Sequence, residues 1–431
     1  MVVAAAATAS AGGAPLLAAV SWVALLFLLL LVLFAVADCD LGLYLRGPAP
    51  PDAFRGKVVW ITGASQGLGE ALARKLAARG ARLVLTSRSR EGLEAVARAL
   101  PPAADENGGG GGGASPCAAA FVLPLDLAAA TQEEFERAAA RADQAFGGAG
   151  VDVLLHVAGG SQHALAEETS DAVAGAVFAL NALGPIKLTR AALPYLTGAK
   201  GGGAGGGGGS GADAAAAAAA ATATAGAKDG GAGGGSGGHR QEQRQQQEQE
   251  RRLRPRRVVA VCSAAAVCPS PGECVYSGAK AALLAYLRSL ASEVADSPLR
   301  VTIALPGPIA TGTEEGKPRV IFGALGLQAP PAPGAPKRSK KGRMDPGRCA
   351  DLVLAAAAYG RDEAWLSRHP VLLLMHAMQF FPSLGRALMR VVGPKRARGM
   401  HTGESSGYDV RALLFGGRGG RGAAAAARKV T

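Results

Sequence analysis

The chain has 431 residues, 62 of them glycine, and a formal net charge of +13. Its length would allow two or three domains, but long glycine and alanine runs cannot build a packed core, so the foldable part has the size of one large domain. The six cysteines form no C-x-x-C pair and no zinc-ligand spacing with the histidines. This pattern argues against a disulfide scaffold and against a metal site.

Much of the positive charge lies in low-complexity or loop-like stretches rather than on one periodic face. These stretches are residues 251–257, 337–343 and 395–398 and the tail to Lys429. Such segments are more typical of solvated linkers than of a binding surface. Lipid headgroups are the alternative partner, and nucleic acid is not expected.

Residues 16–37 contain no charged side chain and are rich in leucine. A helix of this length can cross about 30 Å of hydrocarbon, so we expect a transmembrane anchor after a disordered N-terminus over residues 1–15. A cleaved signal peptide is the competing interpretation, although no Lys or Arg precedes the apolar run. The first basic residues, from Arg46 on, follow the segment and favour a cytosolic body, but cytosolic and lumenal orientations both stay open.

Beyond the anchor, apolar β-type runs alternate with segments of helical composition. Strands are expected at residues 57–61, 82–86, 121–125, 151–157, 258–262 and 301–305, and helices at 70–79, 91–100, 180–196 and 275–294. This alternation predicts a parallel sheet covered by helices on both faces. The fold class is therefore α/β, a Rossmann-type doubly wound sheet of six or seven strands.

The domain boundaries follow from changes in composition. We expect the catalytic domain over residues 52–316, with disordered insertions at 104–116 and 198–255. A long surface insertion adds little closure entropy, so the sheet can tolerate both. A substrate-side loop is then expected at 317–343, a helical C-terminal part of the domain at 344–400, and a flexible tail at 401–431.

Residues 371–392 are strongly apolar, but Pro382 and Arg386 interrupt the run. A second membrane span is therefore not expected. An interfacial helix that collects lipophilic substrate and simple core packing remain equal alternatives.

A glycine-rich turn follows the first strand and opens the first helix. Backbone N–H groups and the helix dipole can hold a pyrophosphate at such a position, because glycines let the backbone approach the phosphates. Glycine spacing alone is weak in so glycine-rich a chain, but its place between a strand and a helix strengthens it. We predict a dinucleotide site at Gly63, Ser65, Gln66, Gly67, Leu68 and Gly69.

The second strand ends at Ser87-Arg88, where NAD-selective folds usually carry an acidic residue. An arginine there suits a 2′-phosphate, so the predicted cofactor is NADP(H), with Arg88 on the phosphate and Arg90 as a second contact. A solvated loop arginine is the alternative for Arg88. Asp126, at the end of the third strand, is expected beside the adenine.

Tyr276 and Lys280 stand four residues apart, so on a helix they project from one face. A neighbouring ammonium stabilises the phenolate and lowers the pKa of a tyrosine toward the working range. The spacing is common in surface helices, but Ser263, thirteen positions earlier at a strand end, could reach the same substrate oxygen. The three residues together predict acid–base chemistry on an oxygen atom.

These residues, together with Asn181 in Leu-Asn-Ala-Leu-Gly and Pro306-Gly307 before Thr311, resemble the short-chain dehydrogenase/reductase family. The resemblance runs from about Lys57 to Thr313 apart from the insertions. Motifs near the C-terminus, among them His369-Pro370, resemble a membrane-anchored dehydrogenase/reductase branch of that family.

The resemblance implies a role for each matched residue. Tyr276 would be the general acid in reduction, with Lys280 on the nicotinamide ribose. Ser263 would orient the carbonyl and Asn181 would hold a relay water. The remaining cofactor contacts implied are Ala158, Gly159, Asn181, Tyr276, Lys280, Pro306, Gly307, Ile309 and Thr311, of which Ile309 and Thr311 would fix the carboxamide.

One position departs from the family pattern. Where the family commonly has Asn-Asn-Ala-Gly, this chain has His156-Val157-Ala158-Gly159. We expect His156 to be structural, steadying the sheet through a ring N–H, rather than a catalytic base. Weaker cofactor binding is the other consequence that we consider.

The expected function is NADP(H)-dependent reduction of a lipophilic ketone or aldehyde, such as a steroid, retinoid or lipid, at a membrane, with the endoplasmic reticulum expected. A cofactor-binding scaffold without turnover and a 3-keto-lipid reductase are the alternatives. The family also implies a homodimer through the helices at 181–196 and 276–294, with Ala281, Ala282 and Leu284 on the shared face. A monomer held at the membrane stays open.

Overall fold

The structure, a computed structural model, describes residues 13–101, 120–199, 254–311, 321–327 and 342–401. The predicted insertion at 104–116, nearly all of that at 198–255, most of the predicted loop at 317–343 and the tail from 402 on lie outside the described residues.

Seven parallel strands form the central sheet, in the order β3-β2-β1-β4-β6-β7-β9. The order reverses direction between β1 and β4, which makes the sheet doubly wound and confirms the predicted Rossmann-type fold. The strands are β1 Val58–Thr62, β2 Arg82–Thr86, β3 Ala120–Val122, β4 Val153–His156, β6 Arg256–Val261, β7 Leu299–Pro306 and β9 Glu363–Leu366.

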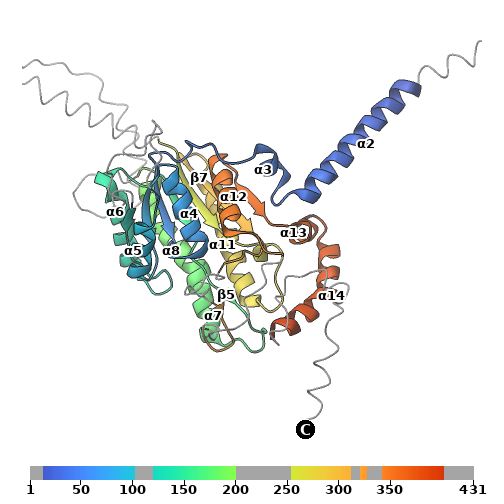
Figure 1. The fold of residues 1–431 in the computed structure, drawn as a ribbon. Helices are drawn as coiled ribbons and strands as arrows, with labels where there is room; N and C mark the ends of the chain where they lie inside the picture. The colour runs from blue at the N-terminus through green and yellow to red at the C-terminus, as the bar shows by residue number, and fades with distance from the viewer. Residues whose placement is uncertain (1–12, 102–119, 200–253, 312–320, 328–341, 402–431) are drawn as a thin grey trace, which may run out of the picture.

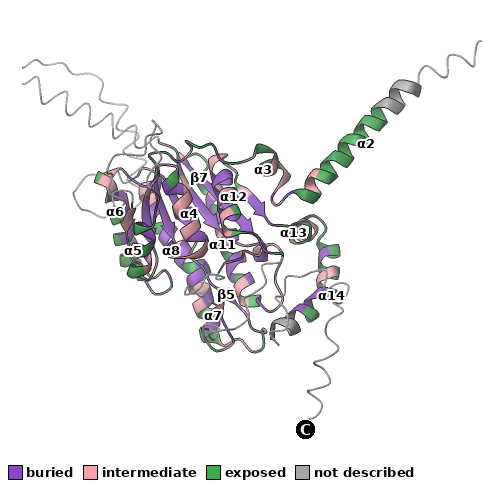
Figure 2. Cartoon of the chain, viewed as in Figure 1, coloured by how far each residue is buried: buried purple, intermediate pink, exposed green. Residues whose placement is uncertain are grey.

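Helices cover both faces of the sheet, so strand residues are buried on both sides, as Figure 2 shows. In β1, Trp60 packs into the core on one face and Ile61 into the core on the other, because successive side chains alternate. The Ile61 face carries α4 Gly67–Ala78, α5 Arg90–Arg98 and α12 Pro346–Ala358. The Trp60 face carries α6 Gln132–Gly148, α7 Asp171–Phe178, α8 Gly184–Leu196 and α11 Cys274–Glu293.

Several elements differ from the sequence-based expectation. The third strand ends at Val122 rather than residue 125, although the N–H groups of Leu123 and Leu125 still donate to the carbonyls of Leu85 and Ser87. The predicted helix near 180–196 is preceded by α7 and by a π-helix, η2 Ala179–Leu183. Helix α6 was not predicted, and the C-terminal part, expected to be helical, also contributes the edge strand β9. Leu284, expected on a dimer face, is buried in the core.

The N-terminal helix α2 Gly13–Val36 extends away from the body, with its side chains exposed from Ala19 to Val32 (Figures 1 and 2). It is long and apolar enough to cross a membrane. The run Asp171–Leu196 also meets that test, but half of it is buried, so it is a core element of the body. After α2 the chain continues through α3 Leu41–Arg46 into the domain.

The C-terminal segment forms α13 Val371–Phe380 and α14 Pro382–His401 beside β9. A second, two-stranded sheet pairs β5 Ser161–Gln162 with β8 Ile321–Phe322. These elements surround the carboxyl ends of the main strands, where the site lies.

Candidate active site

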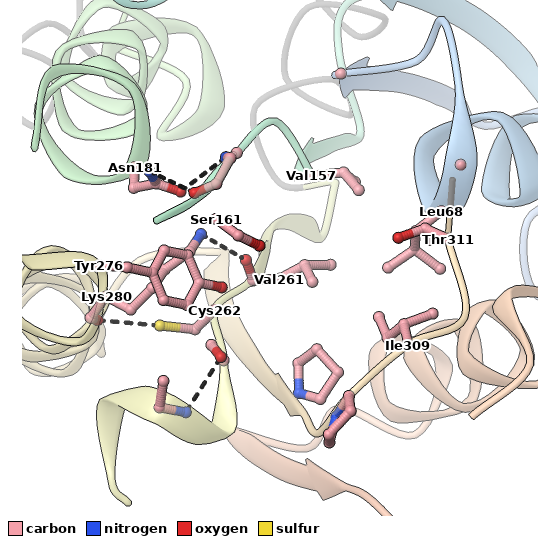
Figure 3. Close-up of a pocket in the computed structure, with 18 of the residues that line it drawn as sticks. Leu68, Val157, Ser161, Asn181, Val261, Cys262, Tyr276, Lys280, Ile309 and Thr311 are labelled. Atoms are coloured by element: carbon pink, nitrogen blue, oxygen red, sulfur yellow. Dashed lines mark hydrogen bonds between the residues drawn. The ribbon is translucent and has the colours of Figure 1, made fainter. Parts of the chain in front are cut away.

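A cavity of about 1110 Å³ opens at the carboxyl ends of the strands, where the strand order reverses. In open α/β sheets this switch point is where ligands bind. Every residue of the predicted catalytic and cofactor sets lines this cavity (Figure 3). Arg90, expected as a second phosphate contact, does not line it and instead lies 3.6 Å from Glu94 in an ion pair along α5.

The glycine-rich turn packs too tightly for any side chain at two of its positions. Gly63 has φ +70°, and a Cβ there would lie 2.7 Å from the Cα of Ala158. A Cβ on Gly69 would overlap the carbonyl oxygen of Gly63. Helix α4 begins just after Gln66, which makes no side-chain cap, so the first N–H groups of the helix are left for a ligand.

The loop after β2 brings Arg88 to the cavity wall with its side chain exposed. Ser89 caps the following helix by accepting a 3.0 Å hydrogen bond from the backbone N–H of Gly92. The carboxylate of Asp126 lies farther along the same wall and accepts a hydrogen bond from the N–H of Ala128 at 2.9 Å. The guanidinium of Arg88 and the carboxylate of Asp126 thus line the same cavity as the glycine-rich turn.

Helix α11 presents Tyr276 and Lys280 to the cavity, with the ammonium 6.0 Å from the centre of the phenol ring. Lys280 is only 4 % exposed, and this burial lowers its pKa. Its Nζ donates to the carbonyl oxygen of Val261 at 3.5 Å, a long hydrogen bond. The charge of the ammonium is therefore weakly screened and acts strongly on neighbouring groups.

Asn181 sits in the π-helix η2, where the widened turn aims it inward, an arrangement frequent at functional sites. Its side chain donates to the carbonyls of Gly160 and Val177 at 3.1 and 3.0 Å and accepts from the N–H of Gly160 at 3.2 Å. A Cβ on Gly159 would lie 2.8 Å from the Asn181 oxygen and 3.4 Å from Lys280 Nζ. The lack of a side chain at Gly159 thus leaves room for the side chains of both Asn181 and Lys280.

Ser263 follows β6 and caps a short 3-10 helix, Ala264–Ala266. Its hydroxyl oxygen accepts a hydrogen bond from the N–H of Ala265 at 3.1 Å. Because a hydroxyl can donate as well as accept, its proton stays available for a ligand oxygen. Figure 3 shows Tyr276, Lys280 and Asn181 on neighbouring helices at one side of the cavity.

The loop after β7 closes the opposite side. Ile309 pairs with Met344 in a parallel bridge, and Thr311 stands against the glycine-rich turn, 3.5 Å from where a Cβ of Gly67 would be. Gly307 has no room for a side chain, since a Cβ would overlap the hydroxyl of Ser367. Figure 3 shows Thr311 beside Leu68 and Ile309 next along the loop.

His156 is fully buried behind the site. Its Nε2 lies 2.9 Å from the hydroxyl oxygen of Thr189, which donates its own proton to the carbonyl of Pro185 at 2.8 Å. Nε2 must therefore carry the ring proton, and Nδ1 is an acceptor without a partner among the described residues. Burial, followed by the charge of Lys280, lowers the pKa of His156 to about 3, so the ring is neutral.

A buried ion pair that sequence reasoning missed ties the C-terminus to the start of α11. Arg396 donates to Glu273 at 2.9 Å and to the carbonyl of Pro271, while His163 Nε2 lies 3.3 Å from the other Glu273 oxygen. Burial alone would raise the pKa of Glu273, but the close contact with His163 and the charge of Arg396 lower it to about 2. The pair holds α14 against the start of α11 at the cavity wall.

The cavity wall on that side is mostly apolar. The two C-terminal helices contribute Val371, Leu374, Met389 and Val392 to it, together with the ion-paired Arg396, and Arg368 lines it just before α13. The sequence showed an apolar run here, but no periodicity distinguished its inner from its outer side chains. No cluster of three or more His, Cys, Asp or Glu residues that could hold a metal occurs in the described part of the chain.

A Rossmann sheet with a glycine-rich turn, a half-buried Tyr276 and a buried Lys280 at one cavity defines an oxidoreductase that uses a nucleotide cofactor. The short chain dehydrogenase family model matches residues 57–204 and 254–319. The chain is 28 % identical to dehydrogenase/reductase SDR family member 7 of Homo sapiens, over 88 % of this chain and 91 % of that one. The chain belongs to the short-chain dehydrogenase/reductase family.

Two further similarities agree with this assignment. The chain is 26 % identical to the 11-beta-hydroxysteroid dehydrogenase-like 2 protein of Arabidopsis thaliana, over 62 % of this chain and 64 % of the relative. It has the fold of a short-chain dehydrogenase from Streptomyces avermitilis, with a TM-score of 0.51 and 23 % identity, covering 80 % of this chain and 98 % of that structure.

Proposed function

We propose that the protein is an NADP(H)-dependent reductase that converts a lipophilic ketone or aldehyde to an alcohol. The observation that carries the proposal is the convergence of Tyr276, Lys280, Ser263 and Asn181 on one cavity that also contains the glycine-rich turn. A protein that only bound the cofactor would need the turn but not the proton-handling groups.

The residues present fit a dinucleotide. The uncapped start of α4 supplies N–H donors for a pyrophosphate, and Gly63 and Gly69 let the backbone approach it. Arg88, in place of an acidic residue after β2, supports a 2′-phosphate and therefore NADP(H). Asp126 would lie near the adenine, with Ile309 and Thr311 near the carboxamide. The bound cofactor would supply the hydride.

The side chains of this protein would manage the proton. The Tyr276 hydroxyl donates to the carbonyl oxygen as negative charge develops there, and the buried Lys280 ammonium stabilises the phenolate that remains. Ser263 donates a second hydrogen bond that positions the carbonyl. Lys280 then passes a proton to the phenolate of Tyr276. Asn181, held by three hydrogen bonds, places a water through which Lys280 regains a proton from solvent.

Three observations support a lipophilic substrate at a membrane. The cavity wall formed by α13 and α14 is apolar apart from the ion-paired Arg396, α2 has the length and composition of a membrane span, and one relative is named as a hydroxysteroid dehydrogenase-like protein. We place the enzyme in the endoplasmic reticulum membrane, anchored by α2. Homodimerisation through α8 and α11 stays part of this proposal, with Ala282 exposed on α11.

The test is oxidation of NADPH by the purified full chain with a panel of steroid, retinoid and 3-keto-lipid carbonyls. Tyr276→Phe should lower kcat at least about 100-fold while NADPH binding is unchanged, because only the transferred proton is lost. Tyr286→Phe, on the same helix but away from the cavity, is the matched control. NADPH binding without oxidation of any panel member would identify a scaffold instead, and full activity of Tyr276→Phe would refute the mechanism.

A further inference from the structure

The outer side of the C-terminal helices exposes a group of large apolar side chains, here called the apolar rim. Each is more than half exposed, and they are Leu373, Phe380, Phe381, Leu384 and Val391. Leu384 and Val391 stand seven residues apart on one stripe of α14, and the side chains of Met389 and Val392 line the cavity from the same helix. Core packing therefore accounts for the inner face of α14 and leaves its outer face unexplained.

The apolar rim lies beside the point where α2 joins the body. The ring of Phe34, in the last turn of α2, lies 5.2 Å from the ring of His376, which in turn lies 6.0 Å from that of Phe380. His369 Nε2 also makes a 2.7 Å hydrogen bond with the carbonyl oxygen of Phe34. Figure 1 shows α13 at the base of α2. His376 thus connects Phe380 of the apolar rim to the last turn of α2 through two successive ring contacts.

The exposed side of α14 also carries positive charge. Arg386 and Arg390 are exposed between the apolar positions, and Arg368, which is exposed just before α13, also lines the cavity. An apolar stripe flanked by arginines is the composition of a helix that lies in the boundary between lipid headgroups and acyl chains. The phosphates of a bilayer are complementary to these three cations.

We propose that the apolar rim is a second membrane-contacting surface, embedded in the headgroup–acyl boundary of the same bilayer that α2 crosses. This inference rests on the proposed membrane span of α2. The inner faces of α13 and α14 line the cavity, so the two helices separate the site from the bilayer. A lipophilic carbonyl compound then enters between them without passing through water.

Contact with lipid is tested on the full chain reconstituted in phosphatidylcholine vesicles whose acyl chains carry bromine, which quenches tryptophan emission at short range. Phe380→Trp and Leu384→Trp are introduced one at a time into a chain that carries Trp22→Phe. Trp60 and Trp365 are kept in every variant, so their emission is a common background. Glu133→Trp on α6, in the same background, is the matched control in water. In the chain that retains Trp22, quenching of the emission of Trp22 reports whether α2 is inserted in the bilayer.

We expect quenching at positions 380, 384 and 22 and none at 133. Quenching of Trp22 without quenching at 380 and 384 would place the apolar rim in water and overturn this inference, while the anchor and the reductase activity stand. Absence of quenching at Trp22 would contradict the proposal that α2 spans the membrane, and this inference would be refuted with it. The NADPH oxidation assay would still decide the proposed function.

The entry route has its own test. The triple variant Phe380→Ser, Phe381→Ser, Leu384→Ser should raise KM several-fold for a carbonyl compound dissolved in the vesicle membrane. KM for a water-soluble carbonyl compound and kcat for both compounds should stay unchanged. Equal changes for the two substrates, or no change for either, would contradict entry from the bilayer.

Discussion

The two ends of the cavity are built in different ways. The nucleotide end consists of short loops that directly follow β1, β2 and β4, and its shape depends on backbone contacts such as that between Gly63 and Ala158. The substrate end joins α11 to α13 and α14, and Glu273 and Arg396, which link them, are 123 positions apart in the chain. One end is therefore shaped by local sterics, and the other depends on a few long-range contacts.

The difference has a functional consequence. A cofactor common to a whole family can be bound by a fixed backbone, since the phosphates and ribose do not change. A substrate pocket must differ between enzymes, so its wall is assembled from a segment that can vary without disturbing the sheet. Variants at the two ends should consequently separate cofactor binding from substrate binding.

Glu273→Gln should have the largest effect. It leaves the buried guanidinium of Arg396 without its carboxylate, which typically costs about 3 to 5 kcal/mol. Because the pair holds α14, KM for the carbonyl substrate should rise while the Kd for NADPH is unchanged. Thermal unfolding measures the loss of stability, and steady-state kinetics and NADPH titration measure KM and Kd. If the Kd for NADPH rose by the same factor as KM, the two ends of the cavity would not bind their ligands independently.

The same residue predicts a dependence of stability on pH. The pKa of Glu273 is about 2 in the folded protein, below its ordinary value of 4.5, so its contribution is complete above pH 4.5 and is lost as the pH falls toward 2. The difference in Tm between wild type and Glu273→Gln should shrink over that range. A difference that stays constant would show that this carboxylate does not titrate as predicted.

Gly69→Ala should affect the opposite end. The new methyl group overlaps the Gly63 carbonyl, so the turn must shift, which costs about 1 to 3 kcal/mol of stability and lowers NADPH affinity. The control is Gly175→Ala in α7, where nothing lies within 4 Å and Ala should be neutral or slightly stabilising. Unchanged NADPH binding by Gly69→Ala, measured by fluorescence titration, would be inconsistent with a phosphate site at this turn.

Arg88→Ala tests the cofactor preference on its own. Loss of a charge-assisted hydrogen bond should weaken NADPH binding by about 10-fold or more and leave NADH binding unchanged. Arg90→Ala, whose side chain pairs with Glu94 along α5, should change neither affinity. Equal weakening for the two cofactors would mean that Arg88 does not contact a 2′-phosphate.

His156→Asn should have the smallest effect at neutral pH, about 1 kcal/mol or less. The pKa of His156 falls from 6.5 to about 3 on folding, so its contribution is complete above pH 6.5 and is lost as the pH decreases toward 3. Wild type should therefore lose more stability than the Asn variant over this range. Parallel Tm profiles for the two proteins would contradict a buried neutral histidine.

Sequence patterns alone predicted six of the seven strands of the sheet and a nucleotide site at the glycine-rich turn. Alternating apolar runs predicted the strands, and the ends of β2 agree to the residue, because buried parallel strands leave a strong local signal. The glycine-rich turn and the Tyr276–Lys280 spacing are likewise local, since a turn and one helical face each need only a few residues. Their meeting in one cavity follows from the parallel topology.

The tertiary structure decided what depends on distant contacts. Strand β9 is four residues long and gains its partner only from β7, and the apolar run at α13 and α14 acquires an inner and an outer face only when α14 packs across the cavity. The charge state of His156 and the pairing of Glu273 with Arg396 are set by burial, which no spacing in the sequence encodes. The sequence by itself therefore predicted acid–base chemistry at Tyr276 and a place for a nucleotide. Only the folded chain determined the wall that the substrate meets, because that wall joins segments that are far apart in the sequence.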